Sequence, residues 1–320
     1  MPSRTLENTV AWGLILTWAN AAAGQSVDLR PKFTTGRVTY YRLVDHEEMK
    51  MGDQGQEKST TEFGFRCTVK DVHPDGSAEL ELTLLYVADS GGTPQSPRKF
   101  DSRRSKGSPS SSVVQSLNLF VDKALVLSVA ADGTIDRLTS FEQIDMAGLT
   151  LPFAGSFIRD MLRAHYEGLF ATRKVPVPTE VGAKWENEST TVALPFMGGG
   201  FKQFTSYTLK SVDLSTQRAK IAMNSVLRWE APEEAGPLTV SMEGKSTGRM
   251  TWDLAAGELV KAADSGQMTM TMTMTTGSGR PSDRKDALVN MTAQNTTMLE
   301  RVKLEDLRLP ADNAKRRRKP

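Results

Sequence analysis

The stretch Gln267-Met-Thr-Met-Thr-Met-Thr-Met-Thr-Thr276 decides the fold. Successive side chains of a β-strand point to opposite faces, so this alternation puts the methionines on one face and the threonines on the other. A helix turns by about 100° per residue and would spread the methionines around its circumference. The stretch therefore predicts a strand of an antiparallel sheet with one buried face and one solvated face.

Paired segments elsewhere in the chain indicate two related halves. Segments 65–80 and 207–221 each predict a strand, a turn and a returning strand, and so do segments 127–135 and 251–259. The openings Gly36-Arg-Val-Thr-Tyr40 and Gly182-Ala-Lys-Trp185 also correspond. We interpret this as an internal duplication, with chance similarity among hairpins as the alternative.

A helical connector is expected between the halves. Ser140 with Gln143 forms a capping-box pattern at the start of a short helix. After Pro152, apolar residues recur at helical spacing and predict a helix packed on the inner face of the sheet. These residues are Phe153, Phe157, Ile158, Met161, Leu162, Tyr166, Leu169 and Phe170, with Arg159, Asp160, Arg163 and Glu167 off the stripe.

The N-terminus has the parts of a secretory signal peptide. Arg4 precedes the apolar run Val10–Ala19, and small residues follow it, so cleavage after Ala21 or Ala23 is expected. The run is shorter than the roughly 20 residues that span a bilayer. No cysteine follows it, so we expect an exported protein, periplasmic or secreted, without a lipid anchor.

The C-terminal tail and the rest of the chain differ in charge. The formal net charge is +2, and removing the five positive charges of the C-terminal tail leaves −3. Those five residues are Lys315, Arg316, Arg317, Arg318 and Lys319. Such a tail either binds an anionic surface or is simply solvated and disordered. No aromatic residue is interleaved with it, so specific nucleic-acid recognition is not expected.

These features divide the chain into five predicted parts. They are a signal peptide (1–23), a first β-rich half (24–137), a helical connector (138–174), a second β-rich half (175–306) and a disordered basic tail (307–320). Within the first half, the segment Asp89–Ser112 is rich in Ser, Gly, Pro and Arg and predicts a long mobile loop.

The sequence contains no pattern typical of catalysis. Its three histidines have no evident catalytic partners, and nucleophile-elbow, phosphate-loop and zinc-protease motifs are absent. The single cysteine, Cys67, lies in phase with Phe63, Phe65 and Val69 and is expected to be a buried apolar residue. We therefore expect a protein that is not an enzyme and has neither a cofactor nor a metal site.

Several short motifs are similar to an uncharacterised family of exported bacterial β-rich proteins, a domain of unknown function. They are Leu29-Arg-Pro-Lys-Phe33, the Asp75-Gly-Ser-Ala78 turn, Phe100-Asp-Ser102, Gly182-Ala-Lys-Trp185 and Gly257-Glu-Leu259. In outline the chain also resembles half-barrel lipid carriers of the LolA and LppX type. That resemblance implies a curved antiparallel sheet with helices on its concave side that holds acyl chains.

The predicted fold class is mainly β with a minor α part. It consists of antiparallel, curved or half-barrel-like sheets in two repeated halves, with the connector packed on the sheet. The predicted function is non-enzymatic binding of an apolar ligand or lipid in the cell envelope. The candidate ligand-binding residues are Met268, Met270, Met272, Met274, Phe157 and Met161. The alternatives are that the methionines are core, or that the protein is a scaffold acting through segment 89–112 and the basic tail.

Overall fold

The computed structural model describes residues 26–52, 55–93, 96–104, 112–140, 159–160, 162–163, 166–189, 192–194, 199–230, 238–276 and 285–310. Thirteen antiparallel strands form one sheet, in the order β10-β11-β12-β13-β14-β15-β2-β3-β4-β6-β7, with β5 paired to β4 and β9 to β11. In the first half these strands are β2 (Val38–Met51), β3 (Gln56–Val72), β4 (Ala78–Thr93), β5 (Ser96–Asp101), β6 (Ala124–Val129) and β7 (Ile135–Thr139). In the second half they are β9 (Lys184–Glu188), β10 (Val192–Leu194), β11 (Gly199–Asp213), β12 (Arg218–Glu230), β13 (Leu238–Asp253), β14 (Glu258–Thr276) and β15 (Lys285–Val302).

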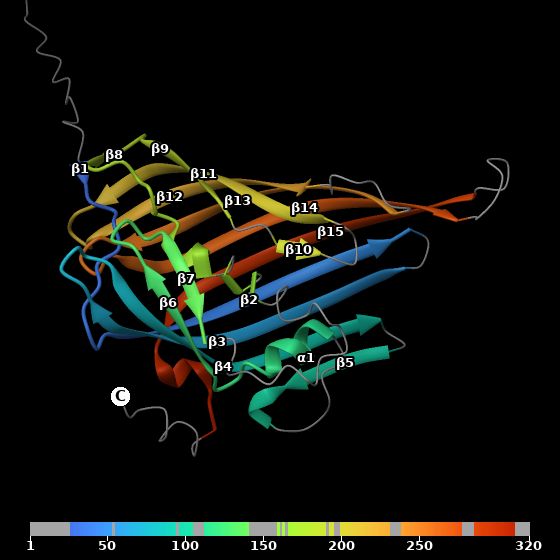
Figure 1. Cartoon of the computed structure of the whole chain (residues 1–320), viewed down its shortest axis with the longest axis horizontal. Helices are drawn as coiled ribbons and strands as arrows, with labels where there is room; N and C mark the ends of the chain where they lie inside the picture. Colours follow the sequence, from blue (N-terminus) through green and yellow to red (C-terminus); the bar gives the residue numbers. More distant parts are fainter. Residues whose placement is uncertain are drawn as a thin grey trace, which may run out of the picture.

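The sheet is long, curved and open. Figure 1 shows β11 to β15 and β2 to β4 side by side along the long axis, as one curved sheet. In the described part of the chain, β10 ends one side of the order and β7 the other, so the sheet does not close into a barrel. This confirms the predicted class of a mainly β protein with a curved, half-barrel-like antiparallel sheet.

Glycines on the inner face allow the strands to come close in the middle of the sheet. A Cβ on Gly248 of β13 would lie 2.6 Å from the carbonyl oxygen of Ala263 and 2.7 Å from Cε of Met223. A Cβ on Gly266 of β14 would lie 2.6 Å from Cβ of Ser246. Because those approaches are too short for real side chains, only glycine fits where these strands bend inward.

The two halves repeat the same meander. Strands β2, β3, β4, β6 and β7 correspond in order and pairing to β9, β11, β12, β13 and β14. The amide of Gly36 donates to the carbonyl of Val69, and the amide of Gly182 donates to that of Leu209, both at 2.8 Å. Register shifts follow at the same place in both hairpins, after Val69 and after Leu209. These matched positions confirm the two repeated halves.

The main core lies at one end of the concave side of the sheet, where the connector packs against the strands. Helical residues 162–163 and 166–167 lead into a 3₁₀ helix, η3 (Gly168–Phe170), whose Leu169 and Phe170 are buried. The ring of Tyr166 contacts that of Phe65 edge-on at 5.7 Å. Both the indole of Trp185 (3.0 Å) and the amide of Asn187 (2.8 Å) donate to the carbonyl oxygen of Ala171. The connector is therefore packed on the sheet, as predicted.

The N-terminal segment closes this end of the core. A short ladder joins β1 (Ser26–Val27) to β8 (Thr179–Glu180), and Leu29 is fully buried. Lys32 then reaches the β13–β14 turn, where its Nζ donates to the carbonyl oxygen of Leu254 at 2.6 Å. A Cβ on Gly257 of that turn would lie 2.3 Å from the backbone nitrogen of Lys32, so only glycine allows the two segments to come this close.

The prediction of a long mobile loop at Asp89–Ser112 is wrong over much of its length. Strand β4 continues to Thr93, β5 pairs with it, and a 3₁₀ turn, η1 (Ser102–Arg104), follows. Helix α1 (Ser112–Asn118) was not predicted; its Val114 and Leu117 are buried. Gly91 and Pro97 are loop signals in the sequence, but both also fit paired strands. A Cβ on Gly91 would lie 2.4 Å from the carbonyl oxygen of Lys58 on β3, so glycine allows this close approach. Pro97 lies on β5, an edge strand, where proline is tolerated.

Two further details depart from the sequence prediction. Glu167, expected off the buried stripe, is buried and forms an ion pair with Arg173 at 3.4 Å. Leu307, assigned to the disordered tail, ends a 3₁₀ helix, η6 (Leu304–Leu307), and is fully buried against Leu85 and Tyr86 on the outer face. Leu307 was missed because its partners are far away in sequence. Glu167 was missed because its partner Arg173 lies six positions later, beyond the end of η3, where the helical period no longer predicts neighbours.

Several predicted segments lie outside the described residues. They are the signal peptide (1–23), most of the connector before residue 159, and tail residues 311–320. Among the helices that the structure does describe, none has the length and apolar character needed to cross a membrane.

Candidate functional site

A cavity of about 430 Å³ lies on the inner face of the sheet, above the connector. Gly168 and Ala171 of the connector form its floor. Its walls come from β11, β12, β13, β14, β15 and β2, so both halves of the chain contribute. Protein interiors rarely leave voids much larger than a water molecule, which makes this hollow a candidate binding site.

The cavity has two apolar zones. Near the floor its walls are Leu43, Met223, Met250, Ala262 and Leu299, and at the other end they are Phe201, Leu227, Met268 and Ala293. The second zone borders a buried cluster in which Val240, Met242 and Met270 pack together, with Met268, Met272 and Met291 against them. An apolar molecule can therefore contact side chains at both ends of the hollow.

A polar row separates the two zones. Residues paired across neighbouring strands share a face, and the pairings align Asp264 of β14, Thr297 of β15, Asp45 of β2, Thr61 of β3 and Asp89 of β4 on the inner side. Acidic and hydroxyl side chains alternate along this row. Asp264, Thr297 and Asp45 line the cavity itself.

Hydroxyl groups donate to the carboxylates of this row. Thr297 Oγ1 donates to Asp45 Oδ1 at 2.9 Å, and Thr61 Oγ1 to Asp89 Oδ1 at 3.4 Å. Ser246 of β13 lies close enough to Asp264 to lower the pKa of its carboxyl group, against the effect of burial. On the other wall, the hydroxyls of Thr205 and Ser225 bond each other at 2.9 Å.

The carboxyl groups lie where charge is costly. Burial raises the pKa of Asp264, and the nearby charge of Asp45 adds to the increase. Burial likewise raises the pKa of Glu47, with further contributions from Asp45 and Glu57. The described lining of the cavity is thus acidic: it contains Asp45, Glu47 and Asp264, with Lys245 as the basic residue among them.

The structure divides the predicted methionine face. Met268 lines the cavity, Met270 is 7% exposed inside the neighbouring cluster, and Met272 packs against that cluster. Phe157 and Met161 lie outside the described residues, as does the side chain of Met274. The role of these residues in ligand binding stays a prediction.

Sequence reasoning missed Asp45 and Asp264, although a signal for both was present. Asp45 is in phase with Tyr41 and Leu43 on β2, and Asp264 is in phase with Met268 on β14. An acidic residue within the apolar period of a strand points toward the interior, where an unpaired charge is unfavourable. Such a position is a candidate for function.

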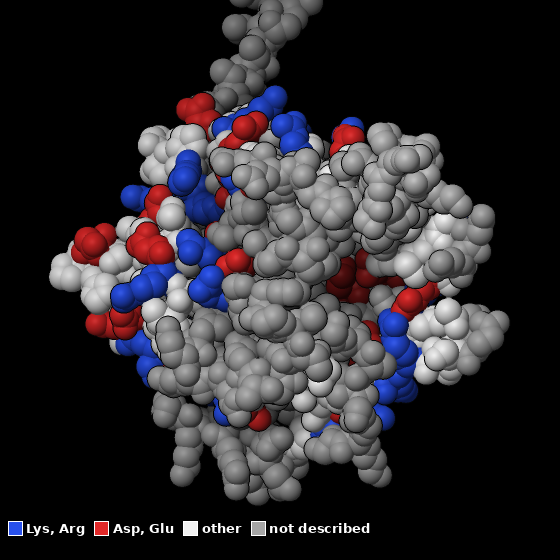
Figure 2. Space-filling model, turned by 45° about the vertical axis from the view of Figure 1, so that its right-hand side comes forward, with Lys and Arg blue, Asp and Glu red and all other residues white. Residues whose placement is uncertain are grey.

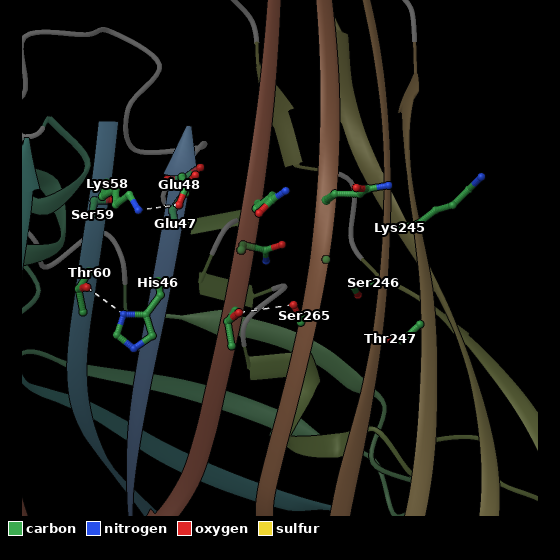
Figure 3. Close-up of a pocket in the computed structure, with 15 residues that line it drawn as sticks. His46, Glu47, Glu48, Lys58, Ser59, Thr60, Lys245, Ser246, Thr247 and Ser265 are labelled. Carbon is green, nitrogen blue, oxygen red and sulfur yellow. Dashed lines mark hydrogen bonds and ion pairs between the residues drawn. The ribbon is translucent and has the colours of Figure 1, made fainter. Parts of the chain in front are cut away.

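A second recess of about 630 Å³ lies on the opposite, outer face of the same strands. Figure 3 shows its side chains spread over neighbouring strands: His46 Nδ1 lies 2.9 Å from Thr60 Oγ1, and Lys58 pairs with Glu48 at 3.0 Å. Thr247 and Ser265 continue the same polar surface. Because its described lining consists of glycine and polar or charged side chains, this recess fits a small-molecule site less well than the inner cavity.

The described residues offer neither a group of metal ligands nor a reactive thiol. No group of three or more His, Cys, Asp or Glu side chains among them could hold a metal ion. Cys67 packs against the core, and burial raises its pKa to about 12, so its reactive thiolate form is disfavoured at neutral pH.

No family model matches this chain, and no curated protein matches it. Among solved structures, it is similar over 89% of both chains to DynF from the dynemicin biosynthesis pathway of Micromonospora chersina, at 7% identity and a TM-score of 0.23. OpdQ of Pseudomonas aeruginosa matches at 7% identity and a TM-score of 0.20, covering 85% of this chain and 100% of that one. The β domain of the Bordetella autotransporter BrkA matches at 10% and 0.23, covering 83% and 99%. Likeness at this level carries no argument about function, and the resemblance to LolA-type carriers stays an expectation from the sequence.

Proposed function

We propose that this protein is an exported, non-enzymatic binding protein of the cell envelope that holds an apolar ligand or lipid in the hollow of its curved sheet. The observation that carries the proposal is the cavity of about 430 Å³ with apolar zones at both ends. Its volume lies within the range of about 300–1,000 Å³ that is typical of small-molecule sites.

The composition of the wall supports the same function. Met268 and the adjoining methionine cluster supply flexible, polarizable side chains that adapt to apolar ligands of different shape. The long strands supply a rigid frame, since β14 spans 19 residues and β15 spans 18. Export itself rests on the N-terminal segment, and binding of the basic tail to an anionic surface stays a prediction.

The proposal is tested by native mass spectrometry of the gently purified protein and by titration with a fluorescent apolar probe. Ala293 lines the cavity beside Met268, its partner across β14 and β15. Ala293→Phe is expected to fill this end and weaken probe binding at least tenfold. Thr292→Phe is the matched control, because Thr292 is the exposed neighbour on the outer face of the same strand.

Equal probe binding by both variants would place binding outside the cavity and contradict the proposal. Absence of both co-purified ligand and probe binding in the unmodified protein would contradict it as well. Thermal unfolding of each variant checks that the fold is retained, so that lost binding is assigned to the filled cavity.

A further inference from the structure

Five acidic side chains among the described residues lie on the inner face beside the cavity. By their pairing, the acidic residues Asp45, Glu47, Glu57, Asp89 and Asp264 all lie on this face of neighbouring strands. Among the described basic residues, Arg98 lies beside them and pairs with Glu57. Figure 2 shows acidic side chains gathered within a hollow of the surface on the side that faces the viewer.

The cavity lining repeats this imbalance. Three of its described residues are acidic: Asp45, Glu47 and Asp264. Lys245 is also part of the lining, but its side chain is 68% exposed and pairs with Glu243 at 3.2 Å, so it does not neutralise the interior. In addition, Oδ2 of Asp89, a side chain that is 4% exposed, accepts no hydrogen bond from the described residues.

The spacing of these carboxylates argues for an organic cation over a metal ion. Asp264 and Asp45 lie on either side of Thr297, two strand spacings or about 10 Å apart along the row. A Ca²⁺ site takes about six to eight oxygen ligands, and no group of three or more His, Cys, Asp or Glu side chains among the described residues could hold a metal ion. A cationic group above Thr297 would lie between the two and be attracted by both.

We infer that the ligand of this cavity is a cationic amphiphile, a molecule whose apolar body contacts the two apolar zones and whose ammonium or guanidinium group lies at the Asp45–Thr297–Asp264 row. This inference rests on the proposed function and assigns the chemical class of its ligand. The row lies between the zones that contain Leu43 and Met268, so the charged group belongs near the middle of the hollow. An anionic lipid would bring its charge against the same carboxylates and is disfavoured.

The experiment compares three probes with the same alkyl chain and different head groups: an alkyltrimethylammonium, the corresponding fatty acid, and a neutral alkyl glycoside. Each competes with the fluorescent apolar probe on the full chain, at pH 7 and below micelle-forming concentrations. The ammonium probe is expected to displace the fluorescent probe at concentrations at least tenfold lower than the other two.

The variants assign this preference to the row. Asp45→Asn with Asp264→Asn is expected to remove most of the tenfold preference for the ammonium probe over the other two. Asp71→Asn is the control, because Asp71 is an exposed carboxylate at the end of β3, away from the cavity. An equal loss of binding for all three probes in the double variant, with an unchanged unfolding transition, would contradict the assigned role of these residues.

The results separate this inference from the proposed function. If all three head groups compete equally while Ala293→Phe still blocks binding, the cavity binds apolar ligands and the cationic class is wrong. If no probe binds, the proposed function fails and the inference fails with it. A preference for the ammonium probe that survives the double variant would also overturn the assignment.

Discussion

Thr297 and Asp45 are hydrogen-bonded across the seam where the last long strand meets the first: Thr297 Oγ1 donates to Asp45 Oδ1 at 2.9 Å. The two residues are 252 positions apart in the chain. On the other side of Thr297 lies Asp264 of β14, so the second half supplies one carboxylate of the row and the first half the other. The site exists only because β15 joins the two halves into one sheet.

The raised pKa of Asp264 predicts that stability depends on pH. Because burial and Asp45 raise this pKa above the ordinary 3.8, the folded protein binds the proton more tightly than the unfolded chain. Ionised Asp264 therefore lowers the free energy of unfolding at neutral pH, and this cost disappears as the pH falls from the raised pKa toward 3.8. Asp264→Asn, which stays neutral at both pH values, should raise the urea midpoint at pH 7 and leave it nearly unchanged at pH 4.

Asp213 gives a control of opposite sign. Hydrogen bonds from Ser215 and Thr216 lower its pKa to about 2, so its contribution is present above pH 3.8 and is lost as pH falls through about 2. Asp213→Asn should lower the urea midpoint at pH 7. If Asp264→Asn instead lowered the urea midpoint at pH 7 relative to the unmodified protein, this would contradict a buried Asp264 with a raised pKa.

Gly248 is predicted to be irreplaceable for a steric reason. A Cβ there would lie 2.6 Å from a backbone oxygen, Ala263 O, which cannot move aside cheaply. Gly248→Ala should therefore destabilise by about 1–3 kcal/mol, as overpacking does. Gly168→Ala is the control, because a Cβ there meets nothing within 4 Å; it should be neutral or stabilise by up to about 1 kcal/mol. Chemical denaturation of both variants measures the difference.

The sequence reveals the local features of this fold well and its long-range contacts poorly. The alternation at Met268–Thr275 predicts the β14 strand because period two is a property of one segment, and the paired hairpins predict the repeat for the same reason. The Asp45–Thr297 contact could not be predicted, because it depends on which strands become neighbours. The packing of Leu307 against Tyr86 was missed for that reason too.

The repeat predicts matched costs at two glycines. Gly36 (φ +80°) and Gly182 (φ +95°) occupy equivalent places, and at neither would an added Cβ meet another atom within 4 Å. Only the backbone conformation then opposes a side chain, at about 1–2 kcal/mol. Gly36→Ala and Gly182→Ala should lower the free energy of unfolding by similar amounts. A difference above about 1 kcal/mol would show that the two positions are not equivalent.

The methionine strand provides the last prediction, which separates core residues from cavity residues. Met270 is 7% exposed between Val240 and Met242, so Met270→Ala should cost about 2–5 kcal/mol of stability through lost burial and a new void. Met268 borders a space that already exists, so Met268→Ala should cost less and weaken probe binding instead. Thr271 lies on the outer face, where its hydroxyl donates to Asn290 Oδ1 at 3.1 Å in an exposed bond; Thr271→Lys should change stability by about 0.5 kcal/mol or less. Unfolding free energies and probe titrations of the three variants check the order, and equal small effects would contradict a strand buried on one face only.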